Sequence, residues 1–359
     1  MRKNYGYDAY RGRSPLRGIL KWIIALLAVV LVLTVAALLW LQQFMVYSSE
    51  GGRLVFPWTE QNTPSASSSA ELESPAVSPT VVVVTPEAPE PEYLHAALLP
   101  REALYDGTAA DRLAETGAQA ALFDMKGDDG SLAYVSALDL AVRAGASSAD
   151  PDLNAAIRTL NGREGLYTIA RVSCFKDDKL SDADRSLNIT TNSGYRWTDP
   201  EGLKWSSPTS ETVRQYVAGV CAELADLGFD EILLDNAGYP TQGSLGYIKP
   251  GAAYDRAQLS AVIGEFYKEV QEALADYPEV RLSVATDRDT LEEGKDERSG
   301  QTLTALVQNA DRLWIREMGA GWARCVERLE AVDFEEPEVN LVAVQDEPGA
   351  EDRSWVCWP

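Results

Sequence analysis

The chain has 359 residues, enough for one large domain or two ordinary ones, and a net charge of −23. Residues 1–47 carry six Lys or Arg against one acidic residue, so the remainder is strongly acidic. An acidic body repels phosphates, which excludes nucleic acid as a partner, disfavours polyanionic substrates and leaves neutral or cationic ligands open.

From Trp22 to Leu41 an apolar run predicts a transmembrane helix. Twenty helical residues span about 30 Å, the thickness of the hydrocarbon core, and Trp22 and Trp40 lie near the ends of the run, where interfacial aromatics belong. A cleaved signal peptide is the alternative, but its apolar region is shorter and ends in small residues. Basic residues precede the span, so we expect residues 1–21 in the cytoplasm and the C-terminal domain outside the cell, held at the lipid bilayer by residues 22–41.

Residues 42–92 are interpreted as a linker. From Thr59 to Glu92 the sequence contains six Pro and six Ser and has no apolar period. This composition is typical of a disordered, semi-extended tether that holds a domain away from a surface.

Apolar runs alternate with helical patterns across residues 93–359. We expect strands at His95–Leu99, Gln119–Asp124, Leu166–Cys174, Glu231–Asp235, Arg281–Ala285, Arg312–Ile315, Asn340–Val344 and Ser354–Trp358. We expect helices at about Ala109–Thr116, Asp150–Leu160, Ser210–Leu227, Tyr254–Tyr277, Thr302–Ala310 and Trp322–Ala331. The alternation favours an α/β fold, a (β/α)8 TIM barrel. A doubly wound sheet is the alternative, but no Gly-rich phosphate loop follows the first strand.

The connection between the last two predicted strands is short. Only a few residues separate "AVQD" from "SWVCWP". We therefore expect the last helix of the barrel to be missing or reduced, with a loop in its place, and Trp355 and Trp358 to seal that edge.

The composition limits the catalytic chemistry as well. His95 is the only histidine, so a Ser-His-Asp or Cys-His site and most zinc sites would need it. We expect His95 inside the barrel rather than in catalysis. The four cysteines show no C-x-x-C pair and are interpreted mainly as small buried residues, with a single disulfide left open. Acid–base chemistry would therefore depend on carboxylates.

In a TIM barrel, function collects at the C-terminal ends of the strands. The candidate catalytic acids at such ends are Asp124, Asp235, Asp287 and Glu317. Two carboxylates on either side of a sugar are the minimum for glycoside hydrolysis, one as proton donor and one as base or nucleophile. Helix capping is the alternative role for each acid. Asp124, Asp128 and Asp129 are spaced like a calcium loop, but Lys126 occupies a ligand position, and we expect no metal and no cofactor.

Basic and aromatic residues lie at the same strand ends. The candidate substrate-binding residues are Lys126, Arg171, Lys176, Trp205, Tyr239 and Arg316. Aromatic faces at these positions suit the stacking of sugar rings, although packing inside the domain is the alternative role.

Four stretches together resemble one family: "AALFDMKGDDGSLAY", "GLYTIARVSCFKDDKL", "GYRWTDPEGLKWSSPTSETVRQY" and "LADLGFDEILLDNAGYP". In order and spacing they are similar to the bacterial family of putative glycoside-hydrolase domains, which are predicted TIM barrels. The resemblance covers about Gln119–Pro240 and extends more weakly from Tyr93 to the end. It implies that Asp124 and Lys126 match the family's "D-x-K", Arg171 and Lys176 its "R…FK", Trp205 its "G-L-x-W" loop, and Asp235 the acid of its fourth-strand motif.

The chain also departs from the family pattern. Asn236 and Gly238 stand where the family has Tyr and Arg, and Ala285 stands where it usually has Asp, so Asp287 is a neighbour of that position. Around Glu317 the family usually has a Pro-Met pair. This altered rim keeps a non-catalytic role open.

The sequence thus predicts a membrane-anchored extracellular glycoside hydrolase that cleaves a neutral or amino-sugar polysaccharide. Asp235 is expected as nucleophile or base, with Glu317, Asp287 or Asp124 as the acid. The alternative from another class is a non-catalytic glycan-binding or cell-wall-associated barrel, and a third is an enzyme for a non-sugar metabolite.

The topology can be tested on intact cells. We expect added protease to release a soluble fragment that begins within Thr59–Glu92, because six basic residues hold the N-terminus in the cytoplasm. Mass spectrometry of the medium identifies the new terminus. Full protection of the body from protease would contradict this topology.

Overall fold

A computed structural model describes residues 45–48, 51–54, 92–316 and 318–358. The predicted cytoplasmic tail, the predicted membrane span and most of the predicted linker lie outside these residues. Among the described helices, none is both long and apolar enough to cross a bilayer. The chain divides into two units, Met1–Thr85 and Pro86–Pro359.

The first unit contains a strand pair. β1 (Met45–Ser48) and β2 (Gly51–Leu54) run antiparallel, with Met45 opposite Leu54. Val46 and Tyr47 are β-branched and aromatic residues, which favour strands. These strands fall within the predicted linker, where no strand pair was expected.

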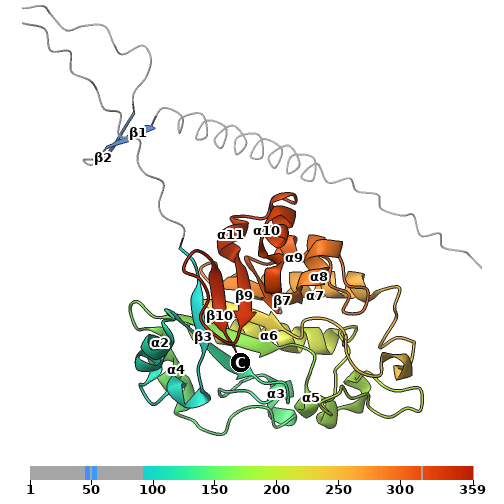
Figure 1. The fold of residues 1–359 in the computed structure, drawn as a ribbon. Helices are drawn as coiled ribbons and strands as arrows, with labels where there is room; N and C mark the ends of the chain where they lie inside the picture. Colours follow the sequence, from blue (N-terminus) through green and yellow to red (C-terminus); the bar gives the residue numbers. More distant parts are fainter. Residues whose placement is uncertain (1–44, 49–50, 55–91, 317, 359) are drawn as a thin grey trace, which may run out of the picture. The chain divides into compact units, whose positions relative to one another are not determined.

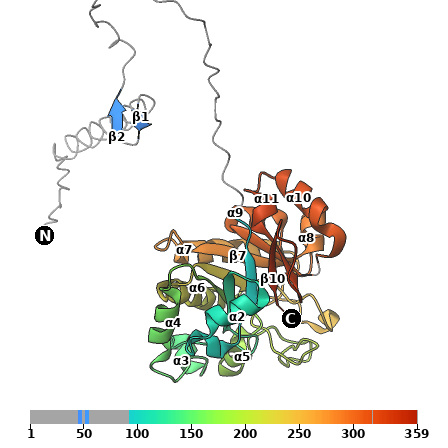
Figure 2. The same ribbon diagram turned by 60° about the vertical axis from the view of Figure 1, so that its left-hand side comes forward.

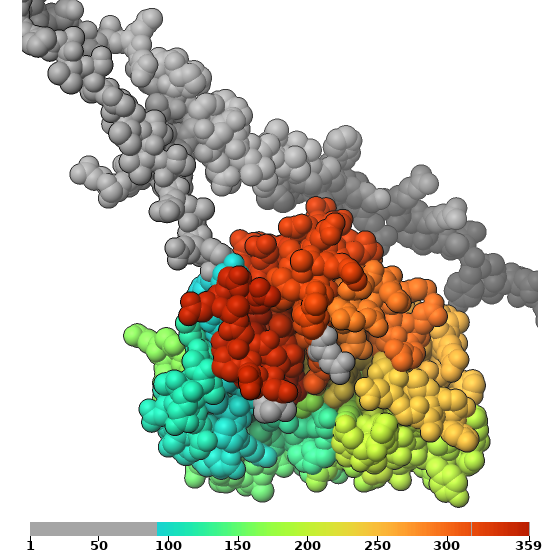
Figure 3. Space-filling view, viewed as in Figure 1, coloured from blue at the N-terminus to red at the C-terminus, as the bar shows by residue number. Residues whose placement is uncertain are grey.

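The second unit is a closed barrel of eight parallel strands. In chain order they are β3 (His95–Leu98), β4 (Ala120–Lys126), β5 (Tyr167–Ser173), β6 (Glu231–Asp235), β7 (Arg281–Asp287), β8 (Arg312–Arg316), β9 (Leu341–Gln345) and β10 (Ser354–Cys357). Each strand pairs with its neighbours in sequence, and β10 pairs with β3 to close the ring. The red β10 and the cyan β3 lie beside each other in Figure 1, and their segments are adjacent on the surface in Figure 3. The predicted TIM barrel is confirmed.

Helices surround the strands (Figure 2). They are α2 (Ala109–Thr116), α3 (Asp139–Arg143), α4 (Leu153–Asn161), α5 (Asp178–Ala183), α6 (Glu211–Asp226), α7 (Leu259–Ala273), α8 (Arg288–Glu293), α9 (Leu303–Asn309), α10 (Trp322–Glu330) and α11 (Pro337–Asn340). Single 3-10 turns add η1 (Arg101–Leu104), η2 (Arg185–Leu187), η3 (Leu245–Tyr247) and η4 (Gly319–Gly321). The four shortest α-helices, α3, α5, α8 and α11, were not predicted, because a few residues cannot show a helical period.

Helix α6 illustrates how the outer layer is built. Val213, Val217, Val220 and Leu224 recur at helical spacing, and all are fully buried in the apolar layer between helices and strands. Cys221 lies in the same stripe. All four cysteines are buried and free, as their interpretation as small core residues expects.

The last connection of the barrel has no helix. Residues 346–353, between β9 and β10, form a loop, as the short spacing predicts. Trp355 of β10 instead faces the outer layer and stacks on His95 of β3, with ring centroids 4.8 Å apart. His95 therefore lies on the outer face of the barrel and not in its interior as expected, because it shares the side of β3 that Ala97 presents to the helices.

The barrel interior is layered, because alternate residues of each strand point inward. On β6, Glu231, Leu233 and Asp235 point inward, while Ile232 and Leu234 join the outer apolar layer. The middle layer is apolar, and the layers at the two ends of β6 are charged. At the N-terminal end, the buried Glu231 accepts hydrogen bonds from Arg312 (2.5 Å), Tyr167 (2.9 Å) and Trp314 (3.2 Å).

Glu231→Ala should destabilise the barrel by about 3–5 kcal/mol, because it leaves the buried Arg312 without its partner. Urea unfolding of a fragment from Pro86 onward measures this loss. Asp226→Ala is the matched control, since its pair with Arg158 is on the surface and should contribute little. An equally small effect of both changes would contradict the importance of the buried pair.

Candidate active site

A cavity of about 500 Å³ opens at the C-terminal ends of the strands. This volume suits a small ligand or a short stretch of a polymer. Of the residues predicted to form the site, the cavity is lined by Asp124, Asp235, Asp287, Arg171, Lys176, Trp205, Tyr239 and Arg316. Glu317 lies outside the described residues. The structure therefore brings together eight of the ten predicted side chains.

Arg171 lies at the centre of the site. On β5 it points inward, two residues after Ile169 of the barrel interior, and its side chain is 7% exposed. Its guanidinium donates to Asp235 through Nε (2.9 Å) and Nη2 (2.6 Å), to Asp124 through Nη1 (2.8 Å) and to Asp128. One buried cation thus joins acids from β4, the loop after β4, and β6.

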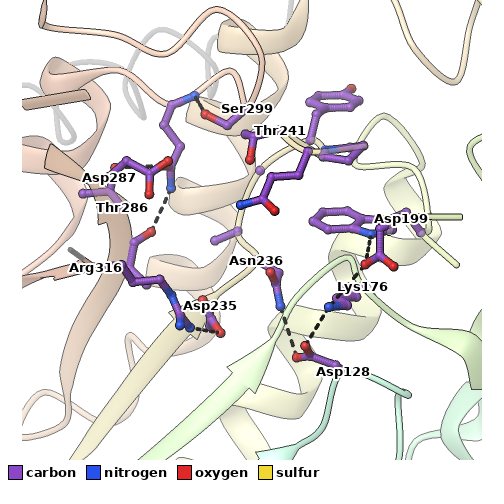
Figure 4. Close-up of a pocket in the computed structure, with 18 of the residues that line it drawn as sticks. Asp128, Lys176, Asp199, Asp235, Asn236, Thr241, Thr286, Asp287, Ser299 and Arg316 are labelled. Atoms are coloured by element: carbon purple, nitrogen blue, oxygen red, sulfur yellow. Dashed lines mark hydrogen bonds and ion pairs between the residues drawn. The ribbon is translucent and has the colours of Figure 1, made fainter. Parts of the chain in front are cut away.

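Asp235 ends β6 and is almost fully buried. Its Oδ2 accepts from Arg171 and also from Nη2 of Arg316 (2.8 Å), as Figure 4 shows on the Arg316 side. Burial alone would raise the pKa of this carboxyl, but the two guanidiniums outweigh burial and hold the pKa below its ordinary value. Oδ1 accepts no hydrogen bond from the described residues, so the ionised acid keeps one oxygen for a ligand.

Asp287 has the opposite electrostatic environment. It ends β7 and lines the cavity on the same side as Arg316 (Figure 4). The surrounding wall desolvates its carboxyl and raises its pKa, and the charge of nearby Asp296 adds to the rise, while Arg316 opposes it. The site therefore contains one carboxyl whose pKa is lowered and one whose pKa is raised.

Lys176 organises the other side of the cavity. Its ammonium pairs with Asp128 (3.0 Å), Asp199 (3.2 Å) and Glu201 (2.5 Å). Figure 4 shows Lys176 and Asn236 converging on Asp128. Burial opposes the ionisation of Asp128, but Arg171 and Lys176 outweigh it and lower the pKa of Asp128 well below its usual range.

Asn236 follows Asp235 with a positive φ of 48°, a conformation that strains most residues but that Asn tolerates. Its Nδ2 donates to Asp128 Oδ1 (3.2 Å) and to Ser173 Oγ (2.9 Å). These bonds fix the turn that leads away from Asp235.

Lys126 does not line the cavity, although the sequence predicted a substrate contact. A β-bulge between Asp124 and Lys126 shifts the register, so Asp124 pairs with Arg171 but Lys126 pairs with Val172, which faces the outer layer. The fully buried ammonium of Lys126 bonds Asp177 (2.8 Å) and the carbonyl of Ser173 (2.7 Å). Lys126 therefore links β4 to the end of β5 and to Asp177 behind the cavity, and has a structural role.

The predicted aromatic residues form part of the wall. Trp205 is 7% exposed and donates from Nε1 to Asp199 (3.2 Å), and Tyr239 is 2% exposed, its hydroxyl bonded to Thr209 (2.6 Å). Both rings are largely covered by protein. Sugar stacking on them stays a prediction.

Gly238 shows why one departure from the family pattern fits this chain. A Cβ at this position would lie 2.9 Å from the carbonyl oxygen of Ser299, whose loop also accepts a hydrogen bond from the backbone of Tyr239. A larger side chain, such as Arg, would displace this loop. In this chain Arg171 and Arg316 supply the guanidiniums around Asp235.

Five charged, polar or aromatic residues that line the cavity were not predicted as site residues: Asp128, Asp199, Glu201, Asn236 and Trp358. Of these, Asp128 was considered only as part of a calcium loop, which was rejected. Asp124 and Asp128 instead both bind Arg171, and Asp129 accepts from Ser131 (2.9 Å). Among the described residues, no group of three or more potential ligands could hold a metal. Strand alternation from Val356 could have pointed to Trp358, whereas nothing in the sequence marks Asp199.

The model of a family described as "Putative glycosyl hydrolase domain" matches residues 103–332, well over half of the chain. The chain belongs to this family. The match covers β4 to β8 and therefore the strands that carry Asp124, Arg171, Asp235, Asp287 and Arg316. No curated protein matches the chain.

Several solved structures are similar. A hypothetical protein from Ruminiclostridium thermocellum is 24% identical, with 52% of this chain and 96% of that chain covered and a TM-score of 0.44. The glycoside hydrolase domain of PgaB (BpsB) from Bordetella bronchiseptica is 14% identical, with 75% and 94% covered and a TM-score of 0.49. Ega3 from Aspergillus fumigatus, in complex with galactosamine, is 15% identical, with 70% and 76% covered and a TM-score of 0.39. At these values the likeness does not extend to substrate.

Arg171→Met should weaken the fold and change its response to acid. Asp128 and Asp235 have folded-state pKa values below the unfolded value of about 4, so they stabilise the fold above that pH, and this contribution is lost as the pH falls. We expect the variant to be less stable at neutral pH and to lose less further stability on acidification. Urea unfolding at neutral and acidic pH measures both effects.

Arg112→Met is the control for this change, because its pair with Asp106 (3.8 Å) is at the surface. A steep acid dependence that is identical in wild type and Arg171→Met would exclude Arg171 as its source.

Proposed function

We propose that the barrel is a glycoside hydrolase in which Asp235 acts as nucleophile or base and Asp287 as the proton donor. The observation that carries this proposal is the opposite shift of the two carboxyl pKa values within one cavity. Such a split is what paired-carboxylate catalysis requires, since one acid must be ionised while the other is protonated.

The geometry supports these roles. In the β6–β7 register Leu234 pairs with Val284, so Asp287 stands two residues, about 7 Å, further along the strands than Asp235. We assign the deeper Asp235, whose pKa is lowered, the attack on the anomeric carbon or the activation of a water molecule. We assign the outer Asp287, whose pKa is raised, the protonation of the departing oxygen.

The charges of the cavity favour a neutral or amino-sugar polysaccharide as substrate. Among the described residues, the lining contains six carboxylates and three cations. All three cations, Arg171, Lys176 and Arg316, already pair with carboxylates, so they offer little to a polyanion. Hydroxyl and ammonium groups are hydrogen-bond donors that suit the remaining carboxylate oxygens.

We place this activity at the outer face of the cell membrane. The apolar run at residues 22–41 and the basic residues before it support an anchored protein with an extracellular barrel. A Pro- and Ser-rich tether would let the barrel reach polysaccharide near the surface.

A non-catalytic glycan-binding barrel is the second candidate. It is favoured by the coordination of Asp235, whose Oδ2 accepts three N–H groups from two arginines, as in a structural ion-pair network. Such a barrel would bind polysaccharide without cleaving it.

Asp235→Asn and Asp287→Asn should separate the two roles. We expect Asp235→Asn to lower turnover by several orders of magnitude and Asp287→Asn by about 10²–10⁴. An aryl glycoside with a good leaving group needs no proton donor, so it should restore activity to Asp287→Asn alone. Asp226→Asn is the matched control, an exposed acid on α6 that neither lines the cavity nor acts on the pKa of Asp287.

The substrates to screen are α- and β-linked glucans, chitosan-like polymers and galactosaminoglycans, with product release measured against pH. Activity should fall as the pH rises through the pKa of Asp287 and as it falls through that of Asp235. Equal activity of Asp235→Asn and wild type would remove Asp235 from the mechanism. Binding of every polymer without cleavage by wild type would favour the non-catalytic barrel.

A further inference from the structure

Trp358 follows β10 and lies in the cavity wall. Val356 belongs to the barrel interior, whereas Trp355 and Cys357 face the outer layer, so alternation turns Trp358 inward. Its ring packs against the apolar interior layer. The indole therefore covers that layer at the depth of the ion pairs.

Two guanidiniums lie on this indole. The Cζ atom of Arg316 is 4.2 Å from the ring centroid and that of Arg171 is 5.0 Å, both within the range of cation–π attraction. They are the same two groups that bind Oδ2 of Asp235. Trp358, the two arginines and Asp235 thus form one connected assembly.

Arg316 depends on the indole more than Arg171 does. The buried Arg171 bonds three carboxylates, whereas the side chain of Arg316 is 41% exposed and, among the described residues, pairs with Asp235 alone. A long, half-exposed side chain with one ion pair has several rotamers open to it. The ring gives Arg316 a second support.

We propose that Trp358 is a positioning residue whose indole fixes Arg316 between the two catalytic carboxylates, so that one guanidinium acts on both acids. This inference rests on the glycosidase function proposed above. In the β7–β8 register Arg316 pairs with Asp287, while its Nη2 reaches Asp235. Its position therefore acts on both acids.

The expected effect has a definite sign. The charged groups that face Asp235 are Arg171, Arg316 and Asp128, and those that face Asp287 are Asp296, Asp289, Arg298 and Arg316. Arg316 lowers the pKa of both carboxyls, so its displacement raises both. The acid limb and the basic limb of the pH–rate profile then move to higher pH together. Loss of packing alone would lower stability without moving either limb.

Trp358→Met in the full-length chain removes the aromatic face and keeps a large apolar side chain. We expect both limbs of kcat/KM against pH to move upward on the order of one unit. Trp358→Phe, which keeps an aromatic face, should restore most of the wild-type profile. Trp322→Met is the matched control, because Trp322 carries Arg353 at 5.3 Å on α10, outside the cavity, and its loss should move neither limb.

An activity-independent readout separates this inference from the proposed function. Carbon-13 NMR titration of aspartate-labelled full-length protein reports the carboxyl pKa of Asp235 and of Asp287, assigned with the Asn variants. Raised values in Trp358→Met support the inference even if no polymer is cleaved, in which case the proposed function fails by itself. Unchanged values, or a higher KM with an unmoved pH profile, would overturn the inference and make Trp358 a surface for substrate.

Arg316→Gln tests the same link with the indole in place. Both carboxyl pKa values should rise there as well, and more than in Trp358→Met. If Trp358→Met does not fold, unchanged values in Arg316→Gln still overturn the inference, because Arg316 would then not control the two acids.

Discussion

The buried guanidinium of Arg171 is the constraint on which the mouth of the barrel depends. A cation with so little access to water must be neutralised by well-placed carboxylates, and Asp235, Asp124 and Asp128 supply them from neighbouring strands and loops. The same contacts hold Asp235 in its ionised form. Fold and chemistry therefore share one set of bonds, and a change that loosens either affects both.

The interior of the barrel repeats this principle at its other end. Glu231 and Arg312 form a buried pair that tyrosine and tryptophan side chains complete, and an apolar layer around Leu233 separates this pair from the site. The two charged layers are thus insulated from each other. Conservation of charge at the N-terminal layer would reflect stability, and at the C-terminal layer function.

The order of the strands and most of the residues that line the cavity could be predicted from the sequence. Strands buried on both faces, such as Glu231–Asp235, leave a continuous apolar run that can be recognised without a structure. The family resemblance then located Asp124, Arg171 and Asp235. Long-range geometry could not be read in this way. The β-bulge that turns Lys126 outward depends on the pairing of β4 with β5. No local sequence pattern predicts this bulge.

The relation between Arg316, Asp287 and Trp358 shows the same limit. Asp287 and Arg316 meet because β7 pairs directly with β8, whereas Trp358 reaches Arg316 from β10, which lies two strands away in the curved barrel. The pKa of a carboxyl depends on such neighbouring charges and on burial. Neither can be predicted from one segment of the sequence.

Parallel strands give the barrel two unlike poles. The chain enters at Glu92, just before the start of β3, whereas the site lies at the opposite pole, where the strands end. The residue at which the chain enters the barrel and the site therefore lie at opposite ends of the strands. The direction of β3 alone thus sets the site at the end of the barrel away from Glu92, so whatever occupies the cavity does not have to pass that residue.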